Sequence, residues 1–312
     1  MRQACLNAVY ELARADDRVV FIGSDLGVGT LAAFRKEFPE RFVMEGVSEA
    51  NVLGMAAGLA MEGHIVYVNT LAVFLTRRAF EQAAIDIALH NLNVRLIGNG
   101  GGLVYAPLGP THMAIEDVAL MRAVPNMAIV APADAREMQR IMPLVHAQEG
   151  PVYIRLAKGN DPIVTSEDEP LAFGRPVCCR SGADALILST GITLRIALEA
   201  AELLAREGAE AGIAHCPTLK PLDRDALAHA MQPVPAVVSI EEHVLSGGLG
   251  SIAAEVIAET PWRRPKRFKR LGLPDAYPSR YGSQADLLKF YGLTPEHLAE
   301  AVLSLRDNTG SG

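Results

Sequence analysis

The stretch at residues 45–69, EGVSEANVLGMAAGLAMEGHIVYVN, places a helix and a strand side by side in one short segment. Its small and helix-favouring residues predict a helix that ends at Gly63, and Ser48 stands where an N-cap would. The apolar run 65–69 that follows is typical of a strand. Because this run is continuously apolar, we expect a parallel sheet covered by helices on both faces.

The same succession of apolar strand and helix continues along the chain. A segment rich in Pro, Asp, Glu and Gly, residues 158–175, has neither periodicity and is interpreted as a linker. We therefore predict two doubly wound α/β domains, residues 1–165 and a smaller unit at 166–312 that includes the linker. The predicted strands are 19–23, 65–69, 94–98, 127–130, 152–156, 185–190, 211–216 and 236–242, and the predicted helices include 77–90, 134–146, 194–207 and 295–305.

Composition excludes several classes of protein. The chain has 312 residues, 50% of them hydrophobic, and a net charge of −7, which gives no electrostatic footprint for nucleic acid. Its short basic cluster, 263–270, is interpreted as a solvated turn. No apolar run reaches membrane-spanning length, and the start shows no signal-peptide pattern. Four cysteines lack CxxC spacing, so we expect no zinc site and no disulfides, in a cytoplasmic enzyme or enzyme subunit.

One acidic side chain, Glu49, interrupts the apolar helix of the opening stretch. If the helix is buried, Glu49 is buried with it, and burial disfavours the ionised form of a carboxylate. Such a group suits a function in which a proton is held or passed. The alternative is an acid placed favourably at a helix N-terminus. The segment alone leaves both interpretations open.

Ligands in open α/β sheets gather beyond the carboxyl ends of the strands, so the residues after each predicted strand are candidates for a site. A glycine-rich run, 98–102, lacks the lysine of a phosphate-binding Walker loop and the spacing of a dinucleotide fingerprint. We interpret it as a flexible active-site loop. The candidate positions are residues 24–26, 70–78, 98–112 and Arg155.

Several phrases in this order and spacing resemble the transketolase family. In the first half they are Glu45-Gly46-Val47-Ser48-Glu49-Ala50-Asn51, Phe74-Leu75 with Phe80-Glu81-Gln82, and Gly109-Pro110-Thr111-His112 followed by Glu116-Asp117. The second half adds Thr218-Leu219-Lys220-Pro221-Leu222-Asp223, and Glu241-Glu242-His243 before Gly247-Gly248-Leu249-Gly250. The resemblance covers nearly the whole chain and corresponds to the pyrimidine-binding and C-terminal domains only.

The resemblance implies a transferase that moves a two-carbon ketol unit between a ketose or ketose phosphate donor and an aldehyde acceptor, using thiamine diphosphate. Glu49 would hydrogen-bond N1′ of the cofactor's aminopyrimidine, and the cofactor acts as an electron sink. His112 would contact substrate oxygens and help to move protons. Phe74 would pack on the aminopyrimidine ring, with Leu71 in a position that is often aromatic in the family.

The resemblance also assigns residues around the cofactor and the substrate. Asp25, Leu26 and Arg77 would lie beside the cofactor, although Asp25 is equally interpretable as a helix cap or turn residue. Arg2 and Arg155 would grip a sugar phosphate, for which a guanidinium fork is suited. For Arg2, a surface arginine at a loose terminus is the alternative.

Three positions depart from the usual family pattern. Leu108 replaces an aspartate four residues before His112, and Gly100 replaces a histidine twelve residues before it. Gly29 replaces a serine that follows the Asp-Leu pair. Because sites that hydrogen-bond hydroxyl groups discriminate strongly among substrates, these losses predict an altered donor or acceptor.

The family's magnesium site needs a Gly-Asp-Gly phrase and a later asparagine, and the chain carries neither phrase nor spacing. We therefore expect no metal ligands here and a split enzyme, in which a separate N-terminal subunit holds the diphosphate and Mg²⁺ in an α₂β₂ heterotetramer. The rival enzymes are a 2-oxo acid dehydrogenase E1 β-type subunit and a deoxyxylulose-phosphate-synthase-like fragment. A non-catalytic scaffold paralogue is the alternative outside enzymes.

Overall fold

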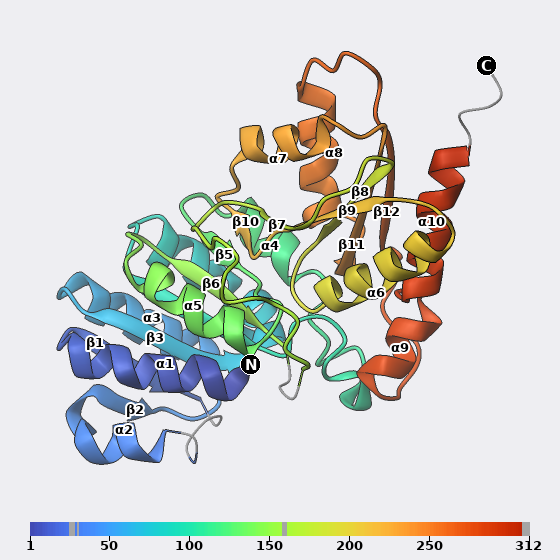
Figure 1. Ribbon diagram of the computed structural model, residues 1–312. Coiled ribbons are helices and arrows are strands. Elements are labelled where there is room, and N and C mark those ends of the chain that lie inside the picture. The colour runs from blue at the N-terminus through green and yellow to red at the C-terminus, as the bar shows by residue number, and fades with distance from the viewer. Residues whose placement is uncertain (25–28, 30, 158–160, 308–312) are drawn as a thin grey trace.

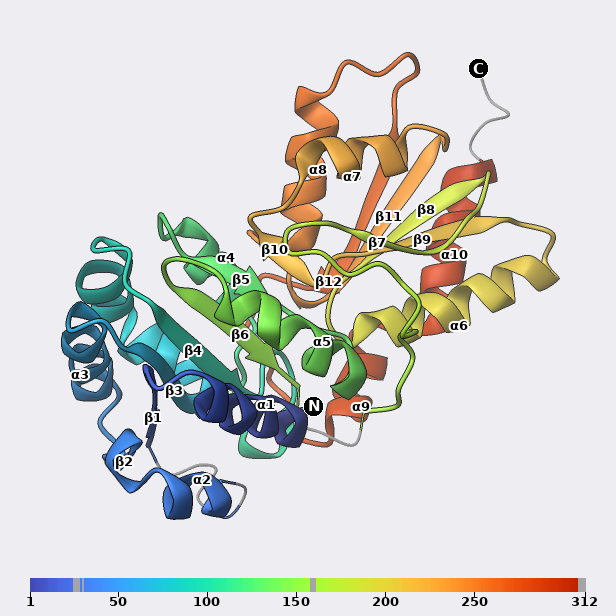
Figure 2. The same ribbon diagram turned by 60° about the vertical axis from the view of Figure 1, so that its left-hand side comes forward.

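The computed structural model describes residues 1–24, 29, 31–157 and 161–307. They form two α/β units, each around its own β-sheet (Figures 1 and 2). The predicted fold class is thereby confirmed. Across these described ranges, no helix combines the length and the apolar composition that a bilayer crossing requires.

The first sheet contains seven strands and includes one from the second half of the sequence. Its neighbours pair in parallel except at one edge, where the strand from the second half joins antiparallel. The first domain is therefore completed by a later segment. In spatial order the strands are β10 (Thr218–Lys220), β5 (Ala128–Val130), β6 (Val152–Leu156), β4 (Val94–Asn99), β3 (Ile65–Leu71), β1 (Val19–Gly23) and β2 (Phe42–Met44).

Helices cover both faces of this sheet, as its apolar strands predict. Successive side chains point to opposite faces: Val19 and Phe21 pack with α1 (Arg2–Ala15) and α5 (Ala135–His146), whereas Val20 and Ile22 pack with α3 (Glu49–Met61). The remaining helical segments of this half are α2 (Ala32–Glu37), η1 (Pro39–Arg41), η2 (Phe74–Arg78), η3 (Gln82–Ala88), η4 (Ala106–Leu108) and α4 (Asp117–Ala123).

The second sheet is smaller, and one of its edge strands, β7, runs antiparallel to its neighbour. In spatial order its strands are β12 (Arg267–Leu273), β11 (Ala236–Val244), β8 (Ala185–Ser189), β9 (Ala211–His215) and β7 (Val177–Arg180). The helices α6 (Thr193–Arg206) and α10 (Pro295–Asp307) cover one face, α7 (Arg224–Met231) and α8 (Leu249–Glu259) the other, and α9 (Gln284–Phe290) lies towards the first domain (Figure 2).

One hydrophobic core continues from one unit into the other. Leu186, Leu188 and Val237 of the second sheet belong to the same buried cluster as Val118 and Met121 of α4. The two units therefore share a packed apolar interface, which fixes the position of the second unit beside the candidate site.

One local prediction was wrong, and one helix has an unexpected geometry. The basic cluster interpreted as a turn instead contributes Arg267–Arg270 to β12, where pairing with β11 stabilises an extended backbone. Lys269 and Arg270 remain exposed at this sheet edge, a usual place for basic side chains. The helical stretch predicted at 77–90 is confirmed, but its turns are the wider ones of the π-helical segments η2 and η3, which include the bond from Ala79 N–H to Phe74 C=O.

The segment interpreted as a linker has its described part anchored to the first domain. Asp134 is the N-cap of α5, and its carboxylate accepts hydrogen bonds from the backbone N–H groups of Val164 and Thr165. The first sheet's last parallel strand ends at Leu156 and the second sheet begins at Val177. The domain boundary between residues 165 and 166 stays a prediction.

Candidate active site

A buried acid, Glu49, stands at the start of α3 in the first domain. Glu49 is the first residue of α3, is 2% exposed, and accepts a 2.8 Å hydrogen bond from Nη1 of the half-exposed Arg78. Ser48 is the N-cap, but its side chain makes no cap hydrogen bond. Burial of Glu49 agrees with the sequence-based expectation, whereas its ion pair with Arg78 was not predicted.

Arg78 brings the candidate side chains of the first domain into one group. Its guanidinium carbon lies 4.2 Å from the centre of the Phe74 ring, a cation–π contact. The Phe74 and His112 rings lie 5.4 Å apart between centroids, edge to face. Glu49, Phe74 and His112, which are far apart in the sequence, therefore form a continuous surface.

The carboxyl ends of β1 and β3 meet beside this group. Ser24 Oγ donates a 2.8 Å hydrogen bond to Thr70 Oγ1, and Leu71 at the end of β3 packs with Phe74 and Ala114. Leu71 and Phe74 thus pack against the same small cluster, and the role of Leu71 at the cofactor stays a prediction. The other candidates at this edge, Asp25 and Leu26, lie outside the described residues.

Arg77 contacts the turn that carries His112. Its guanidinium donates to the carbonyl oxygens of Pro110 and Met113, at 3.3 and 3.0 Å, and pairs with Glu116. This pairing raises the pKa of Arg77. The contacts indicate that Arg77 stabilises the turn that carries His112. Its role at the cofactor stays a prediction.

The turn itself is short and glycine-dependent. Gly109 has φ +79°, a conformation that glycine adopts at low cost, and His112 N–H donates to its carbonyl at 3.0 Å. The Thr111 hydroxyl lies 2.9 Å from His112 Nδ1 and orients the ring. The turn holds the imidazole against Phe74 at the edge of the loop.

Arg155 lies at the end of β6 in a buried ion pair. Its Nε and Nη2 donate to Asp117 at 2.8 and 3.1 Å, and Tyr153 OH donates to the same carboxylate at 2.8 Å. Burial alone raises the pKa of Asp117, but the Arg155 guanidinium lowers it overall. A substrate phosphate would have to compete with this ion pair, so the predicted phosphate contact stays untested.

Arg2 begins α1 at the same edge of the sheet. The sulfur of Met1 accepts a 3.4 Å hydrogen bond from the N–H of Ala157, directly after β6. The start of α1 is therefore held beside the carboxyl end of β6, two residues from Arg155. This location is compatible with the predicted role of Arg2 in substrate binding, which no contact tests.

The second domain contributes a residue that the sequence reasoning missed. Glu242 is 2% exposed, and its Oε1 accepts hydrogen bonds from Leu103 N–H at 2.9 Å and from Gln284 Nε2 at 2.8 Å. Burial raises its pKa to about 7. Leu103 directly follows the glycine-rich run 98–102. Its hydrogen bond to Glu242 therefore connects this part of the first domain to the second domain. The position of Glu242 in the Glu241-Glu242-His243 phrase was the available signal.

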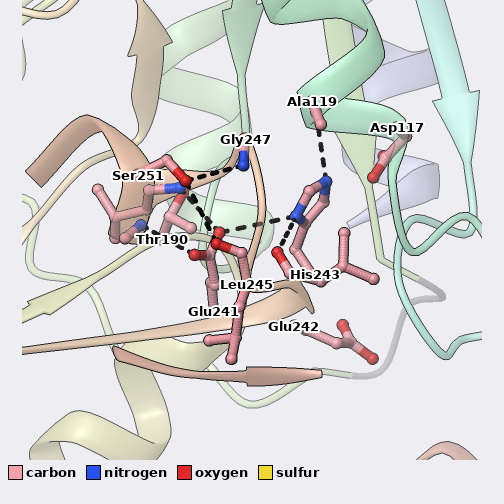
Figure 3. Close-up of polar contacts among 12 residues, drawn as sticks. Asp117, Ala119, Thr190, Glu241, Glu242, His243, Leu245, Gly247 and Ser251 are labelled. Atoms are coloured by element: carbon pink, nitrogen blue, oxygen red, sulfur yellow. Dashed lines mark hydrogen bonds and ion pairs between the residues drawn. The ribbon is translucent and has the colours of Figure 1, made fainter. Parts of the chain in front are cut away.

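The neighbours of Glu242 on β11, Glu241 and His243, also make buried hydrogen bonds (Figure 3). Glu241 accepts the N–H groups of Leu249 and Gly250 at the start of α8, both at 2.8 Å. His243 Nε2 accepts a hydrogen bond from the N–H of Ala119 in α4 at 3.3 Å. The ring proton is therefore on Nδ1, which donates to the carbonyl oxygen of Val244. Glu241 therefore braces the second domain from within, whereas His243 connects it to the first domain.

The group fits one end of a thiamine cofactor better than the other. A buried carboxylic acid beside an aromatic ring matches an aminopyrimidine, which is planar and carries ring nitrogens that accept hydrogen bonds. For the diphosphate and its metal, no cluster of three or more His, Cys, Asp or Glu side chains occurs in the described part of the chain.

Comparisons with known proteins agree with this assignment. Residues 1–162 match the model for the transketolase pyrimidine-binding domain, and residues 174–298 match that for the transketolase C-terminal domain. A protein of Sinorhizobium fredii described as a putative uncharacterized transketolase family protein is 40% identical, over 95% of this chain and 86% of its own.

Of two further relatives, one is described as a subunit and the other as a split gene product. A 6-deoxy-6-sulfo-D-fructose transketolase subunit of a Clostridium species is 35% identical, over 97% of this chain and 93% of its own. A solved structure titled split gene transketolase, inactive β4 tetramer, has a TM-score of 0.88 and 37% identity, covering 98% of this chain and 97% of that one. The predicted resemblance is confirmed: the chain belongs to the transketolase family, as its pyrimidine-binding and C-terminal domains.

Proposed function

We propose that this chain is the C-terminal subunit of a split transketolase, which transfers a two-carbon ketol unit from a ketose donor to an aldehyde acceptor. The observation that supports this most is the continuous group of Glu49, Phe74 and His112 at the carboxyl edge of the first sheet. In this proposal the chain supplies the proton-handling and substrate-facing side chains of a shared active site.

Thiamine diphosphate, when bound, supplies the nucleophilic carbon and the electron sink for breaking and forming C–C bonds. Glu49 would hydrogen-bond the pyrimidine N1′ from its buried position at the start of α3. Phe74 provides the ring against which the pyrimidine packs, with Leu71 beside it. Because Arg78 lies over Phe74 and pairs with Glu49, its guanidinium must leave both groups when the pyrimidine binds.

His112 contacts the oxygen atoms of the reacting carbonyl group and transfers protons to and from them. Its position on a turn braced by Arg77 keeps the imidazole at a fixed distance from Phe74. Arg2 and Arg155, at the same sheet edge, remain proposed contacts of a substrate phosphate, and Asp25, Leu26 and Arg77 remain proposed neighbours of the cofactor.

The diphosphate and Mg²⁺ are held by a separate N-terminal subunit in an α₂β₂ heterotetramer. Support comes from the relatives, which are described as subunits or sections, and from the related β4 tetramer, whose title calls it inactive. All four cysteines of this chain are free, in keeping with the reducing cytoplasm that we propose as its location.

The experiment that tests this proposal compares the purified chain with its complex with a diphosphate-domain subunit. With thiamine diphosphate, Mg²⁺ and hydroxypyruvate as donor, we expect ketol transfer to glycolaldehyde from the complex only. Substantial transfer by this chain alone would overturn the split. Decarboxylation of pyruvate instead of ketol transfer would favour a 2-oxo acid dehydrogenase or a deoxyxylulose-phosphate-synthase-like activity, and an inert complex would favour the scaffold.

A further inference from the structure

The turn that carries His112 is bordered by apolar and aromatic side chains, one of which comes from the second domain. Leu108 is 52% exposed directly before the turn, and Tyr281 is 68% exposed beside it. A methyl group placed on Gly109 would lie 2.6 Å from Cε1 of the Tyr281 ring, so the ring packs directly on the turn. Tyr281 therefore presents an exposed ring directly against the turn that carries His112.

A second aromatic ring covers the start of the same loop. A methyl group placed on Gly100 would lie 2.0 Å from Cε2 of Tyr105, so this ring fills the space that a side chain at position 100 would need. Gly100 also has φ +77°, which disfavours any other residue. The family pattern has a histidine at position 100 and an aspartate at position 108. In this chain the Tyr105 ring fills the space at position 100, and position 108 carries the aliphatic side chain of Leu108.

The second domain fixes Tyr281 relative to this loop. Tyr281 lies shortly before α9, and α9 contacts η4, the segment that ends at Leu108. Gln284 at the start of α9 shares the Glu242 carboxylate with Leu103 N–H. The ring therefore belongs to a built contact between the domains.

We propose that Tyr281, together with Leu108 and Tyr105, forms an apolar wall that selects an acceptor aldehyde with an alkyl or aryl chain over one with a polyhydroxy chain. An alkyl group gains free energy when it leaves water against such a wall, whereas a hydroxyl group loses its hydrogen bonds there. Tyr281 is a specificity-determining residue in this proposal. The inference rests on the proposed ketol transfer at the same site.

The test uses the complex with the diphosphate-domain subunit, hydroxypyruvate as donor, and two four-carbon acceptors, butanal and D-erythrose. The donor's bond to its carboxylate breaks, CO₂ leaves, the electron pair forms the new bond to the aldehyde carbon, and the aldehyde oxygen takes a proton. We expect kcat/KM to be about 10-fold or more higher for butanal than for erythrose. A preference for erythrose in the natural sequence would overturn the proposal.

Variants separate selection from structural support. Tyr281→Ala should reduce the butanal-to-erythrose ratio by about 10-fold through loss of the ring surface, whereas Tyr281→Phe keeps the ring and the ratio. Leu89→Ala removes an exposed apolar side chain between η3 and β4, at the opposite edge of the first sheet, and should leave the ratio unchanged. If Tyr281→Ala lowers kcat/KM equally for butanal and for erythrose, Tyr281 is only a structural contact, and the proposal is contradicted.

Two readouts distinguish failure of this inference from failure of the proposed function. If hydroxypyruvate releases no CO₂ with either acceptor, the proposed ketol transfer is wrong. If CO₂ is released but the enzyme does not prefer the alkyl acceptor, only the proposed apolar wall is wrong. A readout without turnover is saturation-transfer NMR of butyramide with this chain, for which we expect a signal with Tyr281→Phe and loss of it with Tyr281→Ala. Equal signals from both variants would overturn the wall.

Discussion

Two glutamates, Glu49 and Glu242, are equally buried, each 2% exposed, but they have different kinds of partner. Glu49 pairs with Arg78, a half-exposed side chain that can leave without disturbing the backbone. Glu242 accepts a backbone N–H and a side-chain amide that join two domains. Burial alone therefore does not identify a catalytic acid. We propose Glu49 as the catalytic acid because its partner Arg78 is half exposed and also contacts the Phe74 ring.

The comparison predicts that the region around Glu242 controls stability. Asp117→Asn should cost the largest amount, about 3–5 kcal/mol of unfolding free energy, because it leaves the buried Arg155 guanidinium without its counter-charge. Urea denaturation measures the change. A loss below about 1 kcal/mol would show that the ion pair is not part of the scaffold.

Glu242 itself should make stability pH-dependent. The folded protein keeps this acid protonated up to about pH 7, whereas the unfolded chain releases the proton near 4.5. Stability contributed by the protonated acid is therefore full below pH 4.5 and is lost as the pH rises through 7, by up to about 3 kcal/mol. Denaturation midpoints between pH 4.5 and 7.5 measure this contribution.

Glu242→Gln is the matched control for that dependence. The amide cannot lose a proton, yet its oxygen can still accept from Leu103 and Gln284. We expect it to flatten the decline in stability between pH 4.5 and 7. An unchanged pH profile in this variant would assign the titration to another group.

In the region around Glu49, Arg78→Gln is expected to have the smallest effect on the free energy of unfolding. Its guanidinium is half exposed, and partly solvated ion pairs contribute about 0–1 kcal/mol. Thermal or urea unfolding of the variant should therefore match the natural sequence within that range. A loss above about 2 kcal/mol would make the Glu49–Arg78 pair structural and remove its contrast with Glu242.

The sequence predicted the central strands because these depend on local pattern, whereas Phe74 and His112 were assigned from the family resemblance. Continuous apolar runs such as 94–98 and 152–156 have few alternatives to buried parallel strands. It did not predict β10, a three-residue strand whose conformation depends on pairing with β5 in the other domain. Likewise β12 has exposed basic residues that resemble a turn until the neighbouring strand is known.

The same limit explains the missed parts of the site. Tyr281 has no local signal for its contact with the turn at Gly109, and the phrase around Glu242 does not reveal its bond to Leu103, because both contacts join positions more than a hundred residues apart. Arg78 was within a predicted helix, where a wider π-helical turn changes the direction of side chains. Such contacts follow from the packing of the domains, which one sequence does not reveal.

The most direct test of the account is ketol transfer by the complex carrying Glu49→Gln. Glutamine fits the same buried space but cannot hold and release the proton at the pyrimidine N1′. We predict that turnover falls by at least about 100-fold, with stability close to that of the natural sequence. Turnover within twofold of the natural complex would contradict the catalytic role of Glu49.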